Sequence, residues 1–290
     1  VIEAIGNASD LDAHLAAEEA KVAKLKPDLA KAIVWASPAK KRTPLSIVYI
    51  HGFSASRGEF SPVFENVAKE LGANVYFTRL AAHGLDDAGE SFATLTAQAL
   101  MDDAREALAI GRRIGERVIL VGMSTGAALT LELIAENKSA SDIAAHVMIS
   151  PNYCPADSRA RFLSGPLGRT LARFAIGTHR SFKPANDAHR YYWTSSYRSE
   201  GVAAMMDLVN AVDRMDLSQI RVPTMTLYSK KDSVVSVPLI ESKHAEIGAG
   251  LKKIVDLPEA EGHLVAGDAV APQATKAAER EILAFIKGVL

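Results

Sequence analysis

The sequence predicts an α/β fold: a central, mostly parallel β-sheet flanked by helices, with a mainly helical cap inserted into it. Short apolar, β-branched runs alternate with helical stretches along most of the 290 residues. Within each run the apolar residues are consecutive, which is typical of parallel strands buried on both faces. Residues 152–218 interrupt the alternation and are too long for a strand-to-helix connection.

The composition is that of an ordinary globular protein. The chain is 48% hydrophobic and 23% charged, with a formal net charge of −1, so we do not expect it to bind nucleic acid in general. Cys154 is the single cysteine, which excludes an intramolecular disulfide. No run of 18 apolar residues predicts a membrane span. No metal-ligand spacing or glycine-rich dinucleotide motif occurs, so we expect neither a metal nor an organic cofactor.

Residues 1–30 are expected to form a helical extension. Residues 9–12 have the form of a capping box, and an apolar stripe continues to about Leu25 before Lys26-Pro27 ends the helix. The chain begins with Val1 rather than Met, so we expect a truncated or processed N-terminus. The sequence is compatible with a location of the protein in the cytoplasm or in the cell envelope.

The α/β core is expected to comprise residues 31–151 and 219–290. Its strands are rich in β-branched and apolar residues, and we place them at 33–35, 45–50, 74–78, 118–121, 143–149, 222–228 and 252–257. Its helices carry apolar residues at helical spacing, and we place them at 61–71, 94–114, from 127 onward, 238–247 and 273–286. Open parallel sheets bind ligands at the carboxyl ends of their strands. The residues that follow the strands are therefore the candidate site.

The segment Gly122-Met123-Ser124-Thr125-Gly126 joins one predicted strand to the next helix. Such a short turn forces a strained backbone at its apex, and glycine on either side removes the side chains that would collide there. Ser124 is then expected at a helix N-terminus, where free N–H groups favour a developing negative charge. G-x-S-x-G is the pattern of a nucleophile elbow. The sequence therefore predicts Ser124 as a nucleophile.

A second loop has the form of an oxyanion hole. An acyl-transfer site needs two backbone N–H groups, one directly after the nucleophile and one in the loop after a neighbouring strand. The first position is Thr125, and His51-Gly52-Phe53 follows a buried strand. We therefore predict the N–H groups of Phe53 and Thr125 as the two donors. His51 and His83 are each expected to brace a loop.

Asp232 and His263 complete a catalytic triad in the prediction. Ser124, Asp232 and His263 occur in the order nucleophile, acid and base, and each follows a predicted strand. A serine hydroxyl is a weak nucleophile until a neutral imidazole takes its proton. The imidazole in turn needs a carboxylate that fixes its tautomer.

Other residues compete for two of these roles. Asp256 or Asp268 could replace Asp232 as the acid, because each also lies near the end of the core. His244 could replace His263 as the base, although it falls within a predicted helix. The residue pattern alone leaves these alternatives open.

Together the motifs resemble the α/β-hydrolase superfamily, in particular its serine esterase, monoacylglycerol-lipase and serine-aminopeptidase type. The resemblance covers roughly residues 31–290 and is carried by His51-Gly52-Phe53, Ala82-His83-Gly84, Gly122-Met123-Ser124-Thr125-Gly126, Asp232 and Gly262-His263. It implies a mostly parallel sheet, a cap after the sixth strand, no cofactor and hydrolysis of esters. Ala81-Ala82 precedes His83-Gly84 where relatives often have Pro-Gly or Ala-Gly, which is a minor departure.

The expected activity is that of a carboxylesterase, monoacylglycerol lipase or lysophospholipase acting on a small acyl ester. The same triad also supports peptidase and acyltransferase reactions, and the fold does not choose among them. The alternative to an enzyme is a non-catalytic protein that binds a ligand on the same fold. Such a protein would be expected to lack one of the three triad residues. The acyl length and the oligomeric state stay open.

The cap at residues 152–218 contains the aromatic cluster Tyr191-Tyr192-Trp193. These side chains either line a substrate pocket, together with Met123 of the elbow, or form a small core within the cap. The two interpretations are equally compatible with the sequence.

A second feature of the cap is an apolar stripe beside arginines. Leu167, Leu171 and Phe174 fall on one face of a predicted helix, and residues 157–190 carry seven basic and two acidic side chains. In one interpretation the stripe packs on the sheet domain while the arginines are solvated. In the other, the basic amphipathic helix makes peripheral contact with an anionic membrane.

Overall fold

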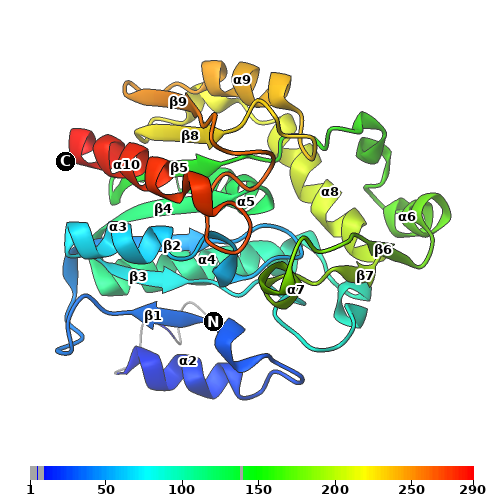
Figure 1. Ribbon diagram of the computed structural model, residues 1–290, viewed down its shortest axis with the longest axis horizontal. Coiled ribbons are helices and arrows are strands. Elements are labelled where there is room, and N and C mark those ends of the chain that lie inside the picture. Colours follow the sequence, from blue (N-terminus) through cyan, green and yellow to red (C-terminus); the bar gives the residue numbers. More distant parts are fainter. Residues whose placement is uncertain (1–4, 6–9, 138–139) are drawn as a thin grey trace.

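The computed structural model describes residue 5, residues 10–137 and residues 140–290. Its centre is a seven-stranded sheet in the order β1-β3-β2-β4-β5-β8-β9 (Figure 1). The strands are β1 (Ala32–Val34), β2 (Thr43–Ile50), β3 (Asn74–Phe77), β4 (Gly115–Met123), β5 (Ile143–Ile149), β8 (Thr224–Tyr228) and β9 (Lys252–Asp256). β1 pairs antiparallel with β3, and the other neighbouring strands of this sheet pair in parallel. The predicted mostly parallel sheet is confirmed.

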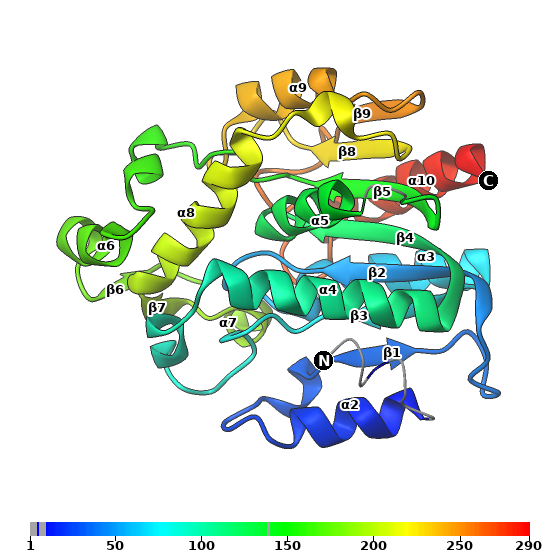
Figure 2. The same ribbon diagram turned by 180° about the vertical axis from the view of Figure 1, so that it is seen from behind.

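Helices cover both faces of the sheet (Figure 1, Figure 2). One face carries α3 (Val63–Leu71) and α10 (Pro272–Val289), and the other carries α4 (Ala97–Ile114), α5 (Thr125–Glu136) and α8 (Glu200–Asp213). β4 shows why the apolar residues are consecutive. Val118 and Leu120 pack into the α4, α5 and α8 layer, whereas Ile119 and Val121 pack into the α3 and α10 layer, because successive strand residues point to opposite faces.

The insertion between β5 and β8 is mainly helical. It consists of η4 (Ser158–Phe162), α6 (Gly168–Ile176), β6 (His179–Ser181), α7 (Asp187–Tyr192), β7 (Ser196–Arg198), α8 and η5 (Leu217–Gln219). In Figure 1, α6, α7, β6 and β7 lie together to the right of the sheet. The resemblance implied a cap after the sixth strand. In the described chain the insertion follows β5, the fifth strand of the sheet, because one strand only, β1, precedes the parallel strands that start with β2.

The N-terminal helix α2 (Leu11–Glu19) is shorter than predicted. Asp10 caps it by accepting a backbone N–H at 3.1 Å, whereas Ser9, the predicted start of the capping box, lies outside the described residues. The helix does not reach Leu25 because Leu25 forms a β-bridge with Leu85. A tertiary contact therefore overrides the local helical pattern.

Two further boundaries differ for local reasons. α4 begins at Ala97 and not at residue 94, because the Thr96 hydroxyl caps it by accepting a backbone N–H at 3.1 Å. β8 begins after Pro223, which has no N–H to donate to a neighbouring strand. The remaining elements are η1 (Pro27–Leu29), η2 (Arg57–Phe60), η3 (Glu90–Ala93) and α9 (Val237–Glu246). None of the helices in the described ranges has both the length and the apolarity needed to cross a bilayer.

Cap helix α6 presents its apolar stripe to solvent. Leu167 is 67% exposed, Leu171 43% and Phe174 93%. The helix packs on α8 through small residues instead, since a Cβ added to Gly168 would lie 3.3 Å from the Cβ of Ala203. The interpretation in which the stripe packs on the sheet domain is therefore wrong.

Candidate active site

Ser124 lies at the apex of the turn between β4 and α5. Its backbone has φ 53° and ψ −113°, a combination that residues other than glycine rarely adopt. The flanking glycines permit it: a Cβ on Gly126 would lie 2.1 Å from the carbonyl oxygen of Ile50, and one on Gly122 would lie 2.4 Å from that of Gly126. The close approach of these backbones holds the serine at the N-terminus of α5.

Asp232 and His263 form a partly buried pair in the loops after β8 and β9. Nδ1 of His263 lies 2.7 Å from Oδ2 of Asp232, and the side chains are 15% and 0% exposed. The other carboxylate oxygen of Asp232 accepts the N–H groups of Val234 and Val235 at 2.8 and 3.1 Å. An ionised carboxylate only accepts, so Nδ1 of His263 is the donor. The other ring nitrogen, Nε2, is then the one that can accept a proton.

The competing side chains have other partners. Asp256 accepts a backbone N–H in the loop after β8, and Asp268 accepts a threonine hydroxyl of α10. His244 on α9 shares a 2.8 Å hydrogen bond with Thr226 on β8. Of the acidic side chains in the described ranges, only Asp232 is within ion-pair distance of His263. Nor do three His, Cys, Asp or Glu side chains converge there as a metal site would require.

Ser150, which follows β5, connects the loops that carry the predicted nucleophile and base. Its hydroxyl donates to the carbonyl oxygen of His263 at 2.8 Å, while the N–H of Ser124 donates to the carbonyl oxygen of Ile149 at 2.8 Å. In the described structure no hydrogen bond joins Ser124 to the ring of His263. Catalytic hydrogen bonds in ligand-free sites are often long and tighten only with substrate.

The predicted oxyanion donors lie on either side of Ser124. Neither the N–H of Phe53 nor that of Thr125 has an acceptor within the described part of the chain. The Phe53 loop passes directly beside the serine, since a Cβ added to Gly52 would lie 3.5 Å from the Cβ of Ser124. Both N–H groups are therefore free to bind an anion.

His51 and His83 brace the loops after β2 and β3, as predicted. Nε2 of His51 accepts the N–H of Leu80 at 3.1 Å, and Nε2 of His83 accepts the N–H of Ser54 at 2.9 Å. Their Nδ1 atoms face the carbonyl oxygens of Gly52 and of the residue two before His83. Burial lowers the pKa of His51 to about 4 and the pKa of His83 well below its ordinary value. Both rings are therefore neutral and able to accept at neutral pH.

The predicted pocket residues occupy different environments. Met123 is the last residue of β4 and is buried in the core, whereas Tyr191 is 40% exposed and donates to a carboxylate of η1 at 3.1 Å. Tyr192 covers η2 so closely that a Cβ on Gly58 would lie 2.2 Å from its ring. Trp193 packs with an alanine of the loop after β2. The aromatics of α7 therefore attach the cap to the loop that carries the predicted oxyanion donor.

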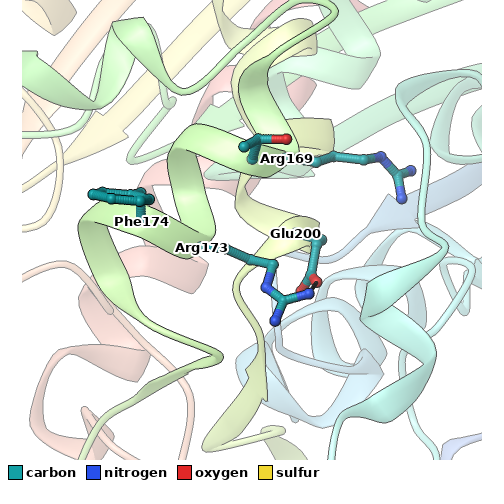
Figure 3. Close-up of a pocket in the computed structure, with 5 residues that line it drawn as sticks. Arg169, Arg173, Phe174 and Glu200 are labelled. Atoms are coloured by element: carbon teal, nitrogen blue, oxygen red, sulfur yellow. Dashed lines mark ion pairs between the residues drawn. The ribbon is translucent and has the colours of Figure 1, made fainter.

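A separate pocket of about 550 Å³ lies on the cap (Figure 3). Its lining residues are Arg169, Thr170, Arg173, Phe174 and Glu200. Arg169 donates 2.6 Å hydrogen bonds to the carbonyl oxygens of Ala93 and Leu95, and Arg173 lies 3.7 Å from Glu200. Arg169 is thus a link between the cap and the loop after η3, and not the solvated side chain that was expected.

The sequence analysis missed one polar residue near the site, Glu59 on η2. It is 1% exposed and accepts the N–H of Gly52, the residue before Phe53, at 2.6 Å. The sequence carried little signal for it, because a single glutamate in a loop is usually solvated.

Comparisons with known proteins agree with this fold. A model of the alpha/beta hydrolase family matches residues 47–276. The structure described with LipS and LipT, two metagenome-derived lipolytic enzymes, has a TM-score of 0.70 at 18% identity, over 91% of this chain and 99% of that one. A soluble variant of monoglyceride lipase from Saccharomyces cerevisiae has a TM-score of 0.67 at 12% identity, over 90% and 91%.

A monoacylglycerol lipase from Paleococcus ferrophilus has a TM-score of 0.63 at 15% identity, over 90% of this chain and 99% of that one. No curated protein matches the sequence. At these identities the solved structures establish the shared fold, while the family model matches the sequence itself over most of its length. This chain belongs to the alpha/beta hydrolase family.

Proposed function

We propose that this protein is a serine hydrolase that cleaves carboxylic esters, with Ser124 as nucleophile, His263 as base and Asp232 as the orienting acid. One observation carries the proposal: a strained serine at a helix N-terminus shares the carboxyl edge of the sheet with a partly buried Asp–His pair, in which Nδ1 of His263 lies 2.7 Å from Oδ2 of Asp232. Serine activation requires this combination of an imidazole and a carboxylate that holds its tautomer.

The reaction proceeds in two half-reactions. Nε2 of His263 takes the hydroxyl proton of Ser124 as Oγ attacks the ester carbonyl carbon, and Asp232 stabilises the imidazolium. The imidazolium then protonates the leaving alcohol as its C–O bond breaks, which leaves the acyl group on Ser124. Water attacks the acyl-enzyme with the same base, and the carboxylic acid leaves.

The negative charge that develops on the carbonyl oxygen is held by the N–H groups of Phe53 and Thr125. Both are backbone donors at defined positions, so they need no reorganisation when the charge appears. Removing one such donor typically costs about 10²- to 10³-fold in kcat.

We propose a small acyl ester as substrate, in the range of carboxylesterase, monoacylglycerol lipase and lysophospholipase activity. The similarity to lipolytic enzymes supports this class. In this proposal residues 31–151 and 219–290 form the core, residues 1–30 the extension and residues 152–218 the cap. The acyl chain lies between core and cap, where Met123, Tyr191, Tyr192 and Trp193 are the proposed pocket residues.

Fluorophosphonate labelling followed by peptide mass analysis tests the proposal. The expected result is one adduct on Ser124, together with turnover on a series of p-nitrophenyl esters from short to long acyl chains. A protein that hydrolyses none of the esters and takes up no label would instead be the ligand-binding protein on this fold.

We further propose that the cap makes peripheral contact with an anionic lipid surface. The exposed apolar side chains of α6 and its surroundings are Leu167, Leu171, Phe174 and Phe162, and the segment 157–190 that carries them contains seven basic and two acidic residues. Apolar side chains that enter a lipid interface beside basic groups bind anionic membranes by both hydrophobic burial and charge.

Vesicle sedimentation measures this contact. Binding to vesicles of phosphatidylcholine and phosphatidylserine should fall as salt is added, and a Leu171→Ser/Phe174→Ser variant should lose it while it still hydrolyses a short soluble ester. Leu251→Ser is the matched control, because Leu251 is also 43% exposed but lies outside the cap. Binding that ignores both salt and the double substitution would contradict the proposal.

A further inference from the structure

Glu59 is a buried acid for which the proposed mechanism has no role. Its Oε1 accepts the N–H of Gly52 at 2.6 Å and the hydroxyl of Tyr49 at 2.8 Å. The Gly52 N–H belongs to the peptide directly before that of Phe53, the proposed oxyanion donor. The hydrogen bond from Gly52 therefore restrains the backbone that aims the Phe53 N–H.

The carboxyl group also lies close to Ser124. A Cβ built on Gly52 would lie 3.1 Å from Oε2 of Glu59 and 3.5 Å from the Cβ of Ser124. A negative charge on Glu59 would thus be near the position where the oxyanion forms, and in a buried site two such charges repel strongly.

The surroundings of Glu59 disfavour that charge. Glu59 shares η2 with Arg57, and the elements packed around it carry the titratable groups Tyr49, Glu65, Tyr192, His263 and Asp268. Among these described groups only Tyr49 has a hydrogen bond to the carboxyl, and Arg57 donates instead to the carbonyl oxygen of Asp28. Burial raises the pKa of Glu59 to about 8, so the side chain is un-ionised at neutral pH.

The turn that carries Glu59 is fixed on two sides. Tyr192 of the cap covers Gly58, and a Cβ on Gly267, in the β9–α10 loop that also carries His263, would lie 2.5 Å from the carbonyl oxygen of Glu59. The turn η2 is thus enclosed by the cap and by the loop of the proposed base. A side chain held this rigidly can set the position of its partner.

We propose that Glu59 is a positioning residue of the oxyanion hole, which holds the N–H of Gly52 and thereby directs the N–H of Phe53 toward the reacting carbonyl oxygen. The inference rests on the proposed serine-hydrolase function.

The first test compares Glu59→Leu with Glu59→Gln below pH 8 on a soluble ester. Glu59→Leu removes the acceptor, so kcat should fall about 10²-fold with little change in KM, because the donor acts in the transition state. Glu59→Gln keeps an oxygen that can accept from Gly52 and should rescue most of that loss. Tyr49→Phe, which removes only the second donor to Oε1, is the matched control and should stay near wild type.

The second test is the pH profile, which a purely structural role would not change. Ionisation of Glu59 should lower the wild-type kcat about tenfold or more as the pH rises above 8, whereas Glu59→Gln should stay flat there. If Glu59→Leu does not fold, as judged by circular dichroism, the profile of Glu59→Gln decides. A wild-type kcat in folded Glu59→Leu, or the same alkaline loss in Glu59→Gln, would overturn the inference. Hydrolysis by Ser124→Ala would instead overturn the proposed function.

Discussion

Ser124→Ala is expected to lose ester hydrolysis by about 10⁴-fold or more in kcat, because the proposed mechanism forms the acyl-enzyme on this hydroxyl. The substitution removes the hydroxyl of a serine that is only 7% exposed and leaves the backbone contacts of the turn in place. The thermal unfolding midpoint should therefore change little. The measurement is the rate on the p-nitrophenyl ester that the wild-type protein hydrolyses fastest.

Ser242→Ala provides the matched control for this experiment. Ser242 is an exposed serine on α9 whose hydroxyl donates only to the carbonyl oxygen of Leu239. It should keep the full rate and the full fluorophosphonate labelling, while Ser124→Ala loses both. Near-wild-type turnover in a clean preparation of Ser124→Ala would refute the serine mechanism.

Asp232→Asn is expected to cost about 10⁴-fold in kcat. An asparagine amide at this position can donate to Nδ1 of His263, which would place the ring proton on Nε2 and leave no base for the serine. Steady-state kinetics of both proteins on the same soluble ester measures this loss.

Asp256→Asn and Asp268→Asn are the controls, since these residues were the alternative acids in the sequence. Each accepts a hydrogen bond away from His263, so each variant should keep most of the activity. If either variant lost most of its kcat while Asp232→Asn kept it, the assignment of Asp232 as the acid would be wrong.

Local pattern was enough to predict the fold. β4 is apolar at every position from Val118 to Val121 because helices cover both faces of the strand. A strand that is buried on both faces can be recognised in the sequence as a run without polar residues. The glycine at 122 is likewise a local requirement, since a Cβ there would lie 2.4 Å from the carbonyl oxygen of Gly126 in the same turn. The glycine at 126 is required by the distant Ile50, but it belongs to the same short turn pattern and was therefore visible in the sequence.

Contacts between distant segments were not predictable in the same way. The pattern left open whether the stripe of α6 packs on the sheet domain. In the structure α6 packs on α8 through small residues, and Leu171 and Phe174 are exposed to solvent. The predicted helix to Leu25 ended early because that residue pairs with Leu85. An amphipathic stripe identifies a face, but the partner of that face is set by tertiary packing.

The sequence by itself determined the α/β class, the order of strands and helices, and the candidates Ser124, Asp232 and His263, because strand burial and tight turns constrain residue type locally. Only the tertiary structure decided which acid contacts His263, where the stripe of α6 points, and that Glu59 is buried against the N–H of Gly52. Those outcomes depend on how close segments that are far apart in the sequence lie in the folded chain. A hydrogen bond or the burial of a polar group is set by this distance in space, and not by the spacing of residues along the sequence.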